Sequence, residues 1–280
     1  MQVKDSVRPS PIAGQWYPGR ADILRHDIEK YLQQAHLPAL DGEVVGIMAP
    51  HAGYLYSGPV AAYAFAAVQG LSPEVVAVVS PMHYPYPYPM LTTLHRAYAT
   101  PLGEIPVAHD LIEQLNAGLR ARGALPLTGV GHDPEHSLEI ELPFLQCVLD
   151  APFRLLPVMV REHTPEVVRT LGEALGDILR EQNALLVAST DLSHFYTQER
   201  ARVLDEEMLR RVAAFDPQGV LRAEEEGKGF ACGRGALAAV MWAARELGAQ
   251  RAQILRHATS GDITGDFSRV VGYGAAVFLR

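Results

Sequence analysis

The stretch that decides the fold runs from Val44 to Pro59 and reads VVGIMAPHAGYLYSGP. Its opening residues, 44–49, form a short apolar run of the kind found in buried strands. A loop follows that is shaped by glycines and prolines and carries His51. Pro59 suits the first turn of a helix. The stretch therefore predicts a buried strand that delivers a histidine to the loop at its carboxyl end.

Further apolar runs of the same kind are spread along the rest of the chain. They predict buried strands at 75–80, 154–160, 185–190, 252–257 and 270–279. Between them, apolar residues recur with helical period in 24–32, 168–179 and 204–215, and 236–244 is apolar all round, as in a buried helix. No linker or repeat marks a domain boundary. Strands that alternate with helices predict a single α/β layered domain with a largely parallel sheet.

The composition excludes several classes of protein. The chain has 280 residues, a formal net charge of −8, 11 histidines and 2 cysteines. Two cysteines form neither a disulfide framework nor a cysteine-rich zinc module, and they fit a reducing cytoplasm, where we expect the protein to lie. With 24 Lys and Arg against 32 Asp and Glu, there is no basic surplus for nucleic acid. We expect no membrane span, since the longest apolar stretch, 270–279, is short. We also expect no secretory signal, since Asp5, Pro9 and Pro11 interrupt the region where its apolar part would lie.

Residues that carry chemistry follow three of the predicted strands. His51 follows the first strand, His83 the second, and Asp191 and His194 follow the strand at 185–190. The carboxyl ends of parallel strands share one edge, where ligand sites of open α/β sheets form. We therefore expect three imidazoles and a carboxylate to meet in one site. The alternative is that each histidine sits separately in its own loop.

The segment after the strand at 185–190 suggests an acid/base pair. Asp191 and His194 are close enough in sequence to interact across a turn, so that the carboxylate fixes the imidazole tautomer. Ser193 adjoins His194, which leaves a serine hydrolase as an alternative. The chain has no G-x-S-x-G elbow, which weakens that alternative.

Another cluster, Glu135-His136-Ser137-Leu138-Glu139, places His136 and Glu139 on one face if the segment is helical. Ser137 as a helix cap is the simpler interpretation, and both can hold together. The cluster does not match H-E-x-x-H, so a metalloprotease lacks support.

Cys232 lies in a glycine-flanked segment just before the apolar helix predicted at 236–244. A thiol near a helix N-terminus with Arg234 beside it is expected to ionise readily, and thiolate is the form that binds metals or attacks electrophiles. Cys147 is interpreted as a small core residue. Gly233-x-Gly235-x-x-Ala238 lacks a preceding strand, so we expect no nucleotide.

With these residues in place, the sequence resembles the Memo family, also called AmmeMemoRadiSam system protein B, which is related in fold to class III extradiol ring-cleaving dioxygenases of the LigB type. The resemblance covers nearly the whole chain and rests on motifs in one order: Gly14-x-Trp16-Tyr17-Pro18, Pro50-His51-Ala52-Gly53-Tyr54, Glu135-His136-Ser137-Leu138-Glu139, Ser189-Thr190-Asp191-Leu192-Ser193-His194 and Cys232-Gly233. It implies a single domain over 1–280 with a mixed, mostly parallel central sheet flanked by helices on both faces.

The resemblance also implies a metal site. His51, His83 and Cys232 match the family's metal positions, where Cys232 stands in place of the carboxylate of the dioxygenases. His194 matches their acid/base histidine, with Asp191 beside it. Thiolate in place of carboxylate softens the site, which favours copper or zinc and argues against simple ring cleavage. The segment Tyr84-Pro85-Tyr86-Pro87-Tyr88-Pro89 departs from the family pattern and is expected to form a pocket wall or lid.

Three hypotheses follow. The first is a redox protein that binds Fe(II) or copper, with zinc as a further option, and that transfers protons through His194 and Asp191. The second is a non-catalytic module that binds a small molecule or peptide in a cleft lined by Trp16, Tyr54, His136 and Glu139. The third is thiol chemistry by Cys232 alone. Family members often occur alongside a radical-SAM protein and an AMMECR1-like protein, which the resemblance implies as partners.

Overall fold

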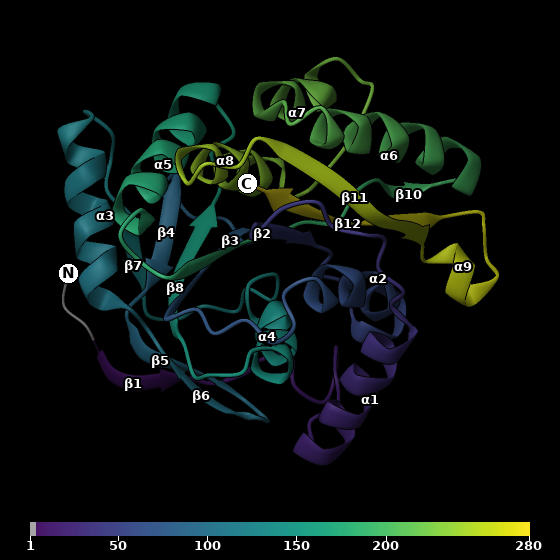
Figure 1. The fold of residues 1–280 in the computed structure, drawn as a ribbon, viewed down its shortest axis with the longest axis horizontal. Coiled ribbons are helices and arrows are strands. Elements are labelled where there is room, and N and C mark those ends of the chain that lie inside the picture. Colours follow the sequence, from purple (N-terminus) through teal and green to yellow (C-terminus); the bar gives the residue numbers. More distant parts are fainter. Residues whose placement is uncertain (1–3) are drawn as a thin grey trace.

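A large mixed sheet runs through the middle of the molecule (Figure 1). The computed structural model describes residues 4–280. Within that range the strands of the large sheet are, in chain order, β2 (Val44–Ala49), β3 (Val75–Pro81), β4 (Met90–Thr93), β7 (Thr128–Val130), β8 (Arg154–Val160), β9 (Ala184–Ser189), β10 (His194–Tyr196), β11 (Arg251–Thr259) and β12 (Val270–Leu279). Their spatial order is β10-β12-β2-β9-β3-β8-β4-β7, and β11 pairs with β12.

The four central strands, β2, β9, β3 and β8, run parallel to one another. Antiparallel partners flank them, because β12 is antiparallel to β2 and β4 is antiparallel to β8. Parallel strands covered on both faces are apolar along their whole length, and every residue of β3 is buried. All six strands predicted from apolar runs are present. The α/β fold with a mixed sheet and flanking helices is therefore confirmed.

Helices cover both faces of the large sheet (Figure 1). The helices within the described residues are α1 (Ala21–Gln34), α2 (Tyr54–Ala66), α3 (His109–Ala121), the 3-10 helix η1 (Glu139–Glu141), α4 (Leu142–Val148), α5 (Pro165–Leu179), α6 (Gln198–Ala213), α7 (Pro217–Glu225), α8 (Arg234–Glu246) and α9 (Gly261–Thr264). On one face α2 packs against β2, β11 and β12, with α1 and α4 beside it. On the other face α8 packs against the central strands, with α5 and α7 outside it.

The apolar segment predicted as a buried helix is the core of α8, whose residues from Gly235 to Ala244 are all buried. Its packing against α5 depends on Gly172. A Cβ at that position would lie 2.5 Å from the carbonyl oxygen of Ala239, which no side chain tolerates. The two helix backbones therefore approach closely, and α8 is held tightly on the sheet.

A second, three-stranded sheet consists of β1 (Lys4–Arg8), β5 (His95–Thr100) and β6 (Gly103–Pro106). Polar and charged residues interrupt these strands, so apolar runs do not reveal them. The strand β1 ends at Arg8, whose side chain is buried. No helix among residues 4–280 has both the length and the apolar character needed to cross a bilayer.

Candidate metal centre

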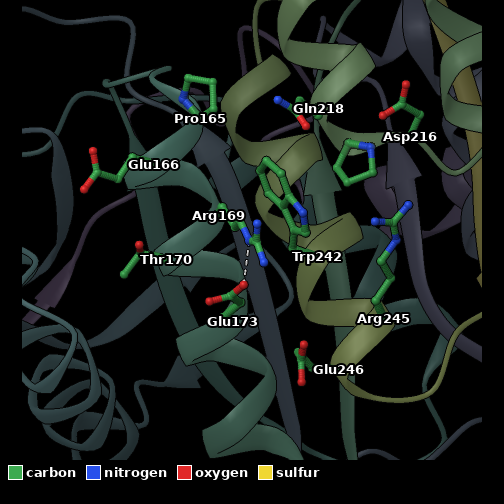
Figure 2. Close-up of a pocket in the computed structure, with 11 residues that line it drawn as sticks. Pro165, Glu166, Arg169, Thr170, Glu173, Asp216, Gln218, Trp242, Arg245 and Glu246 are labelled. Carbon is green, nitrogen blue, oxygen red and sulfur yellow. Dashed lines mark hydrogen bonds and ion pairs between the residues drawn. The ribbon is translucent and has the colours of Figure 1, made fainter.

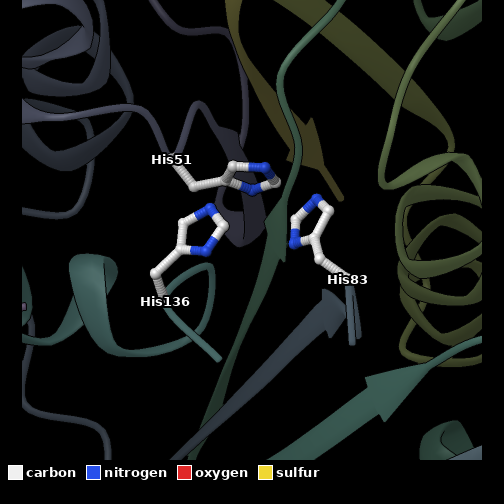
Figure 3. A group of neighbouring side chains, drawn as sticks. All are labelled: His51, His83 and His136. Carbon is white, nitrogen blue, oxygen red and sulfur yellow. The ribbon is translucent and has the colours of Figure 1, made fainter. Parts of the chain in front are cut away.

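Three imidazoles meet at the carboxyl edge of the parallel strands (Figure 3). His51 follows β2, His83 follows β3, and His136 comes from the loop before η1. One ligand atom from each lies within 4.8 Å of the others. The rings of His83 and His136 stack with centroids 4.8 Å apart, and His51 meets both edge-on at 5.3 and 5.5 Å. His51 is buried and His83 is exposed, so the cluster opens to solvent on the His83 side.

The protonation of His51 is set by its neighbours. Its Nδ1 lies 2.9 Å from the hydroxyl oxygen of Ser189, the last residue of β9. That hydroxyl donates its single proton to the carbonyl of Ser137 at 2.6 Å, so it can only accept from His51. Nδ1 therefore carries the ring proton, and Nε2 keeps a lone pair for a ligand.

One buried carboxylate orients the other two imidazoles. Glu135 accepts hydrogen bonds from the backbone N–H of His83 at 2.6 Å and from its Nδ1 at 2.8 Å. The same carboxylate accepts the backbone N–H of His136 at 3.0 Å and lies 3.3 Å from its Nδ1. Burial opposes ionisation, yet hydrogen bonding and the charge of His83 bring the pKa of Glu135 down to about 2. A carboxylate bonded to Nδ1 leaves Nε2 as the metal-binding atom.

Two of the three imidazoles, those of His51 and His136, are held neutral near pH 7, which is the form that binds a metal. Burial lowers the pKa of His136 from 6.5 to about 4, and burial together with the neighbouring histidines lowers the pKa of His51 well below 6.5. Three imidazoles whose Nδ1 atoms face Ser189 or Glu135 suit a divalent or monovalent transition metal. Sequence reasoning missed the role of Glu135. The available signal was its position beside His136 in the same motif.

In the metal-free protein, replacing His136 with phenylalanine is expected to change how stability depends on pH. The unfolded His136 imidazole, with its pKa near 6.5, binds a proton as the pH falls toward 4, whereas the folded one does not until its lower pKa is reached. The stability that depends on neutral His136 is thus complete above pH 6.5 and is lost as the pH falls toward 4. Phenylalanine does not titrate, so His136→Phe does not lose this stability. The difference in free energy of unfolding between His136→Phe and wild type should therefore change by about 2 to 3 kcal/mol in favour of the variant between pH 6.5 and pH 4. Urea unfolding with a chelator present measures the shift, and a pH-independent difference would contradict it.

Asp191 and His194 lie beside the cluster without bonding to each other. Asp191 Oδ1 accepts the backbone N–H of His51 at 2.7 Å, and burial raises the pKa of this carboxyl to about 7. His194 Nδ1 donates to the carbonyl of Leu192 at 2.8 Å. The backbone, and not Asp191 as the sequence suggested, therefore fixes the tautomer of His194. Its Nε2 is left free, and burial lowers its pKa.

Cys232 contacts the cluster through His51, with Sγ 3.1 Å from Nε2. Burial raises the pKa of this thiol, which therefore donates its proton to the Nε2 lone pair. Arg234 pairs with Glu224. The expectation of a readily ionised thiol activated by Arg234 is therefore wrong for the metal-free protein. Among residues 4–280, the group of potential ligands whose atoms lie within 4.8 Å of one another consists of His51, His83 and His136, and Cys232 adjoins it.

Comparison with known proteins identifies the family of the chain. The family model described as Memo-like protein matches residues 8–277. The chain belongs to the Memo family. It is 36% identical to a MEMO1 family protein of Methanopyrus kandleri, over 98% of this chain and 99% of the relative. It is 32% identical to a MEMO1 family protein of Nitrosopumilus maritimus, over 98% of this chain and all of the relative. The resemblance inferred from the motifs is confirmed.

Of the four residues predicted to line a cleft in this Memo-family chain, two are partly exposed and two are buried. Trp16 packs on His136, with ring centroids 4.2 Å apart. Tyr54 is buried, and its hydroxyl donates to the carbonyl of Ile140 at 2.7 Å. Glu139 is fully buried behind the cluster, where it accepts a hydrogen bond from Tyr17 at 2.7 Å. Only Trp16 and His136 therefore combine exposure with a place beside the metal centre.

A groove of about 500 Å³ lies next to the cluster of the Memo-family chain. Ala52, which follows His51, and Phe195, which follows His194, line it together with Trp16, Tyr56 and Tyr273. Phe195 is 62% exposed and has φ 64°, a left-handed conformation that is uncommon outside glycine. Four of the lining side chains are aromatic, and the groove lies between the loop that follows His51 and the segment that follows His194.

A larger hollow of about 620 Å³ lies between α5, α7 and α8 (Figure 2). Charged side chains line it, and Arg169 pairs with Glu173 across 2.6 Å on α5. None of the site residues predicted from the sequence lies there. In this Memo-family chain the histidine cluster is therefore separate from the hollow.

Proposed function

We propose that this Memo-family chain is a metal-dependent redox protein in which His51, His83 and His136 hold Fe(II) or copper. One observation carries the proposal: three imidazoles from separate parts of the chain converge within 4.8 Å. Ser189 and Glu135 engage the Nδ1 atoms. A cluster that formed only for packing would not need the Nδ1 atom of each ring to be oriented by a hydroxyl or a carboxylate, with Nε2 directed away from these groups.

The donor set determines which metals suit the site. Imidazole is a good ligand for iron, copper and zinc, and the group of three contains no hard carboxylate that would favour magnesium or calcium. Cys232 adds a soft donor beside His51, which favours copper or zinc once its proton is released. Such an ion, when bound, supplies a centre that exchanges electrons and has open coordination positions.

The neighbouring residues supply proton transfer in this proposal. His194 Nε2 is free to accept a proton because Nδ1 is held by Leu192. The Asp191 carboxyl has a pKa of about 7, raised by burial, which suits proton exchange near neutral pH. Asp191 also holds the backbone of His51, so a change in its charge is felt at the metal ligand.

Anaerobic titration of chelator-treated protein with Fe(II), Cu(I) or Zn(II) tests the proposal. We expect one ion per chain, and for iron or copper a reversible redox couple. His83→Ala should weaken the affinity by at least about 100-fold, because removing a ligand costs no less than removing the group that orients it. His26→Ala, which removes an exposed histidine of α1, should bind as the wild type does. If wild type and His83→Ala bound equally, the proposed centre would be excluded, and binding of zinc alone would exclude the redox role.

The groove beside the histidine cluster supports a second candidate function, which is binding of a small molecule or peptide without catalysis. Its lining by Trp16, Tyr56 and Phe195 offers flat apolar surfaces beside the metal centre. This candidate predicts saturable ligand binding that persists after metal removal and that falls in Trp16→Ala. Binding that requires the metal would favour the redox protein instead.

A further inference from the structure

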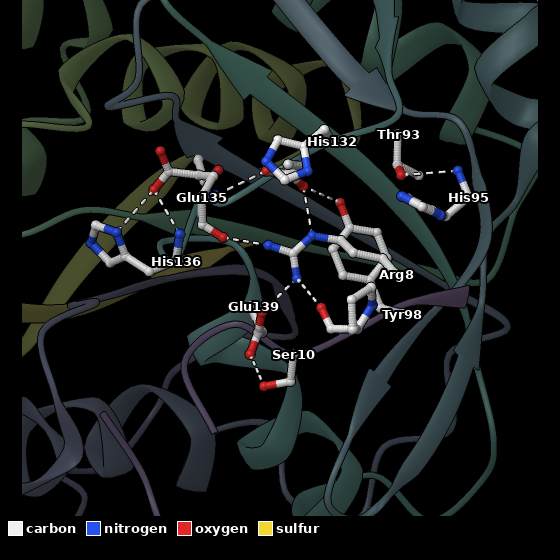
Figure 4. A network of polar contacts seen from close by, with 12 residues as sticks. Arg8, Ser10, Thr93, His95, Tyr98, His132, Glu135, His136 and Glu139 are labelled. Atoms are coloured by element: carbon white, nitrogen blue, oxygen red, sulfur yellow. Dashed lines mark hydrogen bonds and ion pairs between the residues drawn. The ribbon is translucent and has the colours of Figure 1, made fainter. Parts of the chain in front are cut away.

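Arg8 lies behind the metal centre, where β1 meets the loop that carries His136 (Figure 4). Its side chain is only 1% exposed, although arginine is among the residues least often buried. Arg8 is not one of the three clustered histidines or their direct neighbours. Its side chain does, however, bond to the segment that carries Glu135 and His136.

The three directions of the guanidinium are each matched by an acceptor. Nε donates to the Asp133 carboxylate at 2.7 Å, Nη1 to the Glu139 carboxylate at 2.5 Å and Nη2 to the carbonyl of Glu135 at 2.5 Å. The ring of Tyr98 lies 4.8 Å from the guanidinium carbon. All three acceptors belong to the segment 133–139, which also contains His136. One side chain therefore holds both ends and the middle of this segment.

The segment has little regular structure of its own to hold it. Residues 131–138 form neither helix nor strand, and η1 begins only at Glu139. The carbonyl of Glu135 binds Arg8, while the carboxylate of the same residue orients His83 and His136. A displacement of this backbone would consequently move the orienting carboxylate and the third imidazole together.

Burial of an arginine contributes little net stability, because the charged guanidinium must be removed from water. Desolvation of three charges offsets much of their attraction, so apolar residues of similar volume are often at least as stabilising. The planar guanidinium instead supplies fixed geometry, which a lysine ammonium does not reproduce. Its placement under a ligand loop fits a role in orientation.

We propose that Arg8 is a positioning residue of the metal centre, which sets the place of His136 and Glu135 by holding segment 133–139. The inference rests on the proposed metal binding. It predicts that loss of the guanidinium loosens the ligand loop and weakens metal affinity beyond what an equal loss of stability would produce.

Arg211 provides a matched control. It is 7% exposed and donates to Glu207 at 2.8 Å, to Glu226 at 2.7 Å and to the carbonyl of Gly219 at 2.6 Å. It thus has two carboxylates and one carbonyl as partners, as Arg8 does, but on α6 and α7. Arg8→Met and Arg211→Met are both expected to lower the melting temperature. Only Arg8→Met should weaken metal affinity, by about 10- to 100-fold, the range seen when groups that orient ligands are lost.

Hydrogen exchange gives a readout that needs no metal. The backbone N–H groups of Glu135, His136 and Ser137 bond to Asp133 and Glu135 within the loop. In the metal-free protein they should exchange faster in Arg8→Met than in Arg211→Met. If Arg8→Met does not fold, Arg8→Lys takes its place with the same expectation. If these three N–H groups exchange at the same rate in the Arg8 and Arg211 variants, the inference is overturned. If the wild type binds no metal, the proposed function is overturned, and hydrogen exchange still tests whether Arg8 holds the segment 133–139.

Discussion

Replacing His136 with alanine is expected to weaken metal binding by at least about 100-fold, whereas Cys232→Ala should retain affinity within about 10-fold of wild type. His136 belongs to the group of three imidazoles whose ligand atoms lie within 4.8 Å of one another, and Glu135 lies 3.3 Å from its Nδ1. Cys232 keeps its proton because burial raises the pKa of the thiol, so it competes poorly for an ion until deprotonated. Titration with Zn(II) and Fe(II) measures both affinities under the same conditions.

The family resemblance makes the opposite prediction, because it assigns the metal to His51, His83 and Cys232. Under that assignment, Cys232→Ala would lose the ion and His136→Ala would keep it. The two variants therefore form an internal control for one another, since each removes one candidate ligand and leaves the other. The absorption spectrum of the Co(II) or Cu(II) form adds a second test, because a thiolate ligand gives strong charge-transfer bands that imidazole does not.

Replacing Glu135 with alanine is expected to damage both the metal centre and the fold. The carboxylate is fully buried and accepts N–H groups from His83, His136 and Ser137. Without it these donors lose their partners, and removal of one side of a buried polar network costs about 3 to 5 kcal/mol. Both imidazoles also lose the group that fixes their orientation, so affinity should fall by about 100-fold or more. Urea unfolding and metal titration give the two numbers.

Asp205 is a suitable control for this variant. Its buried carboxylate accepts the backbone N–H of Ser193 at 2.9 Å and binds His257 Nε2 at 2.8 Å, so it is also a carboxylate that supports a histidine. Asp205→Ala should lower stability while metal affinity stays near that of wild type. If Glu135→Ala loses stability alone, or if Asp205→Ala loses metal to the same degree, the orienting role assigned to Glu135 is wrong.

The sequence was most informative where burial dictates composition. Strands β2, β3 and β8 are apolar because they are covered on both faces, and their runs give the strand positions nearly to the residue. The meeting of His51 with His83 follows from these strand positions, since the carboxyl ends of the parallel strands in a sheet share an edge. Strand β1 and its partner β5 mix polar with apolar residues, so apolar runs do not predict them.

The part of the site that could not be predicted depends on long-range polar contacts. Arg8 and Glu139 are 131 positions apart, and no local pattern indicates that they bond. Motif membership singled out Tyr54 and Glu139, yet it does not distinguish a side chain that faces a ligand from one that supports the site from behind. Likewise, the position of Cys232 before a helix suggested an ionised thiol, and burial opposes that ionisation.

The order of the strands has a consequence for synthesis of the chain. The strands that lead to His51 and His83, β2 and β3, are not paired with each other, because β9 lies between them. All three histidines are made before residue 137, but the strand that spaces two of them is made only at 184–189. A nascent chain that has not reached this point has the ligands without their spacing. The histidine cluster, and with it the proposed metal centre, is therefore completed only after β9 has been inserted between β2 and β3.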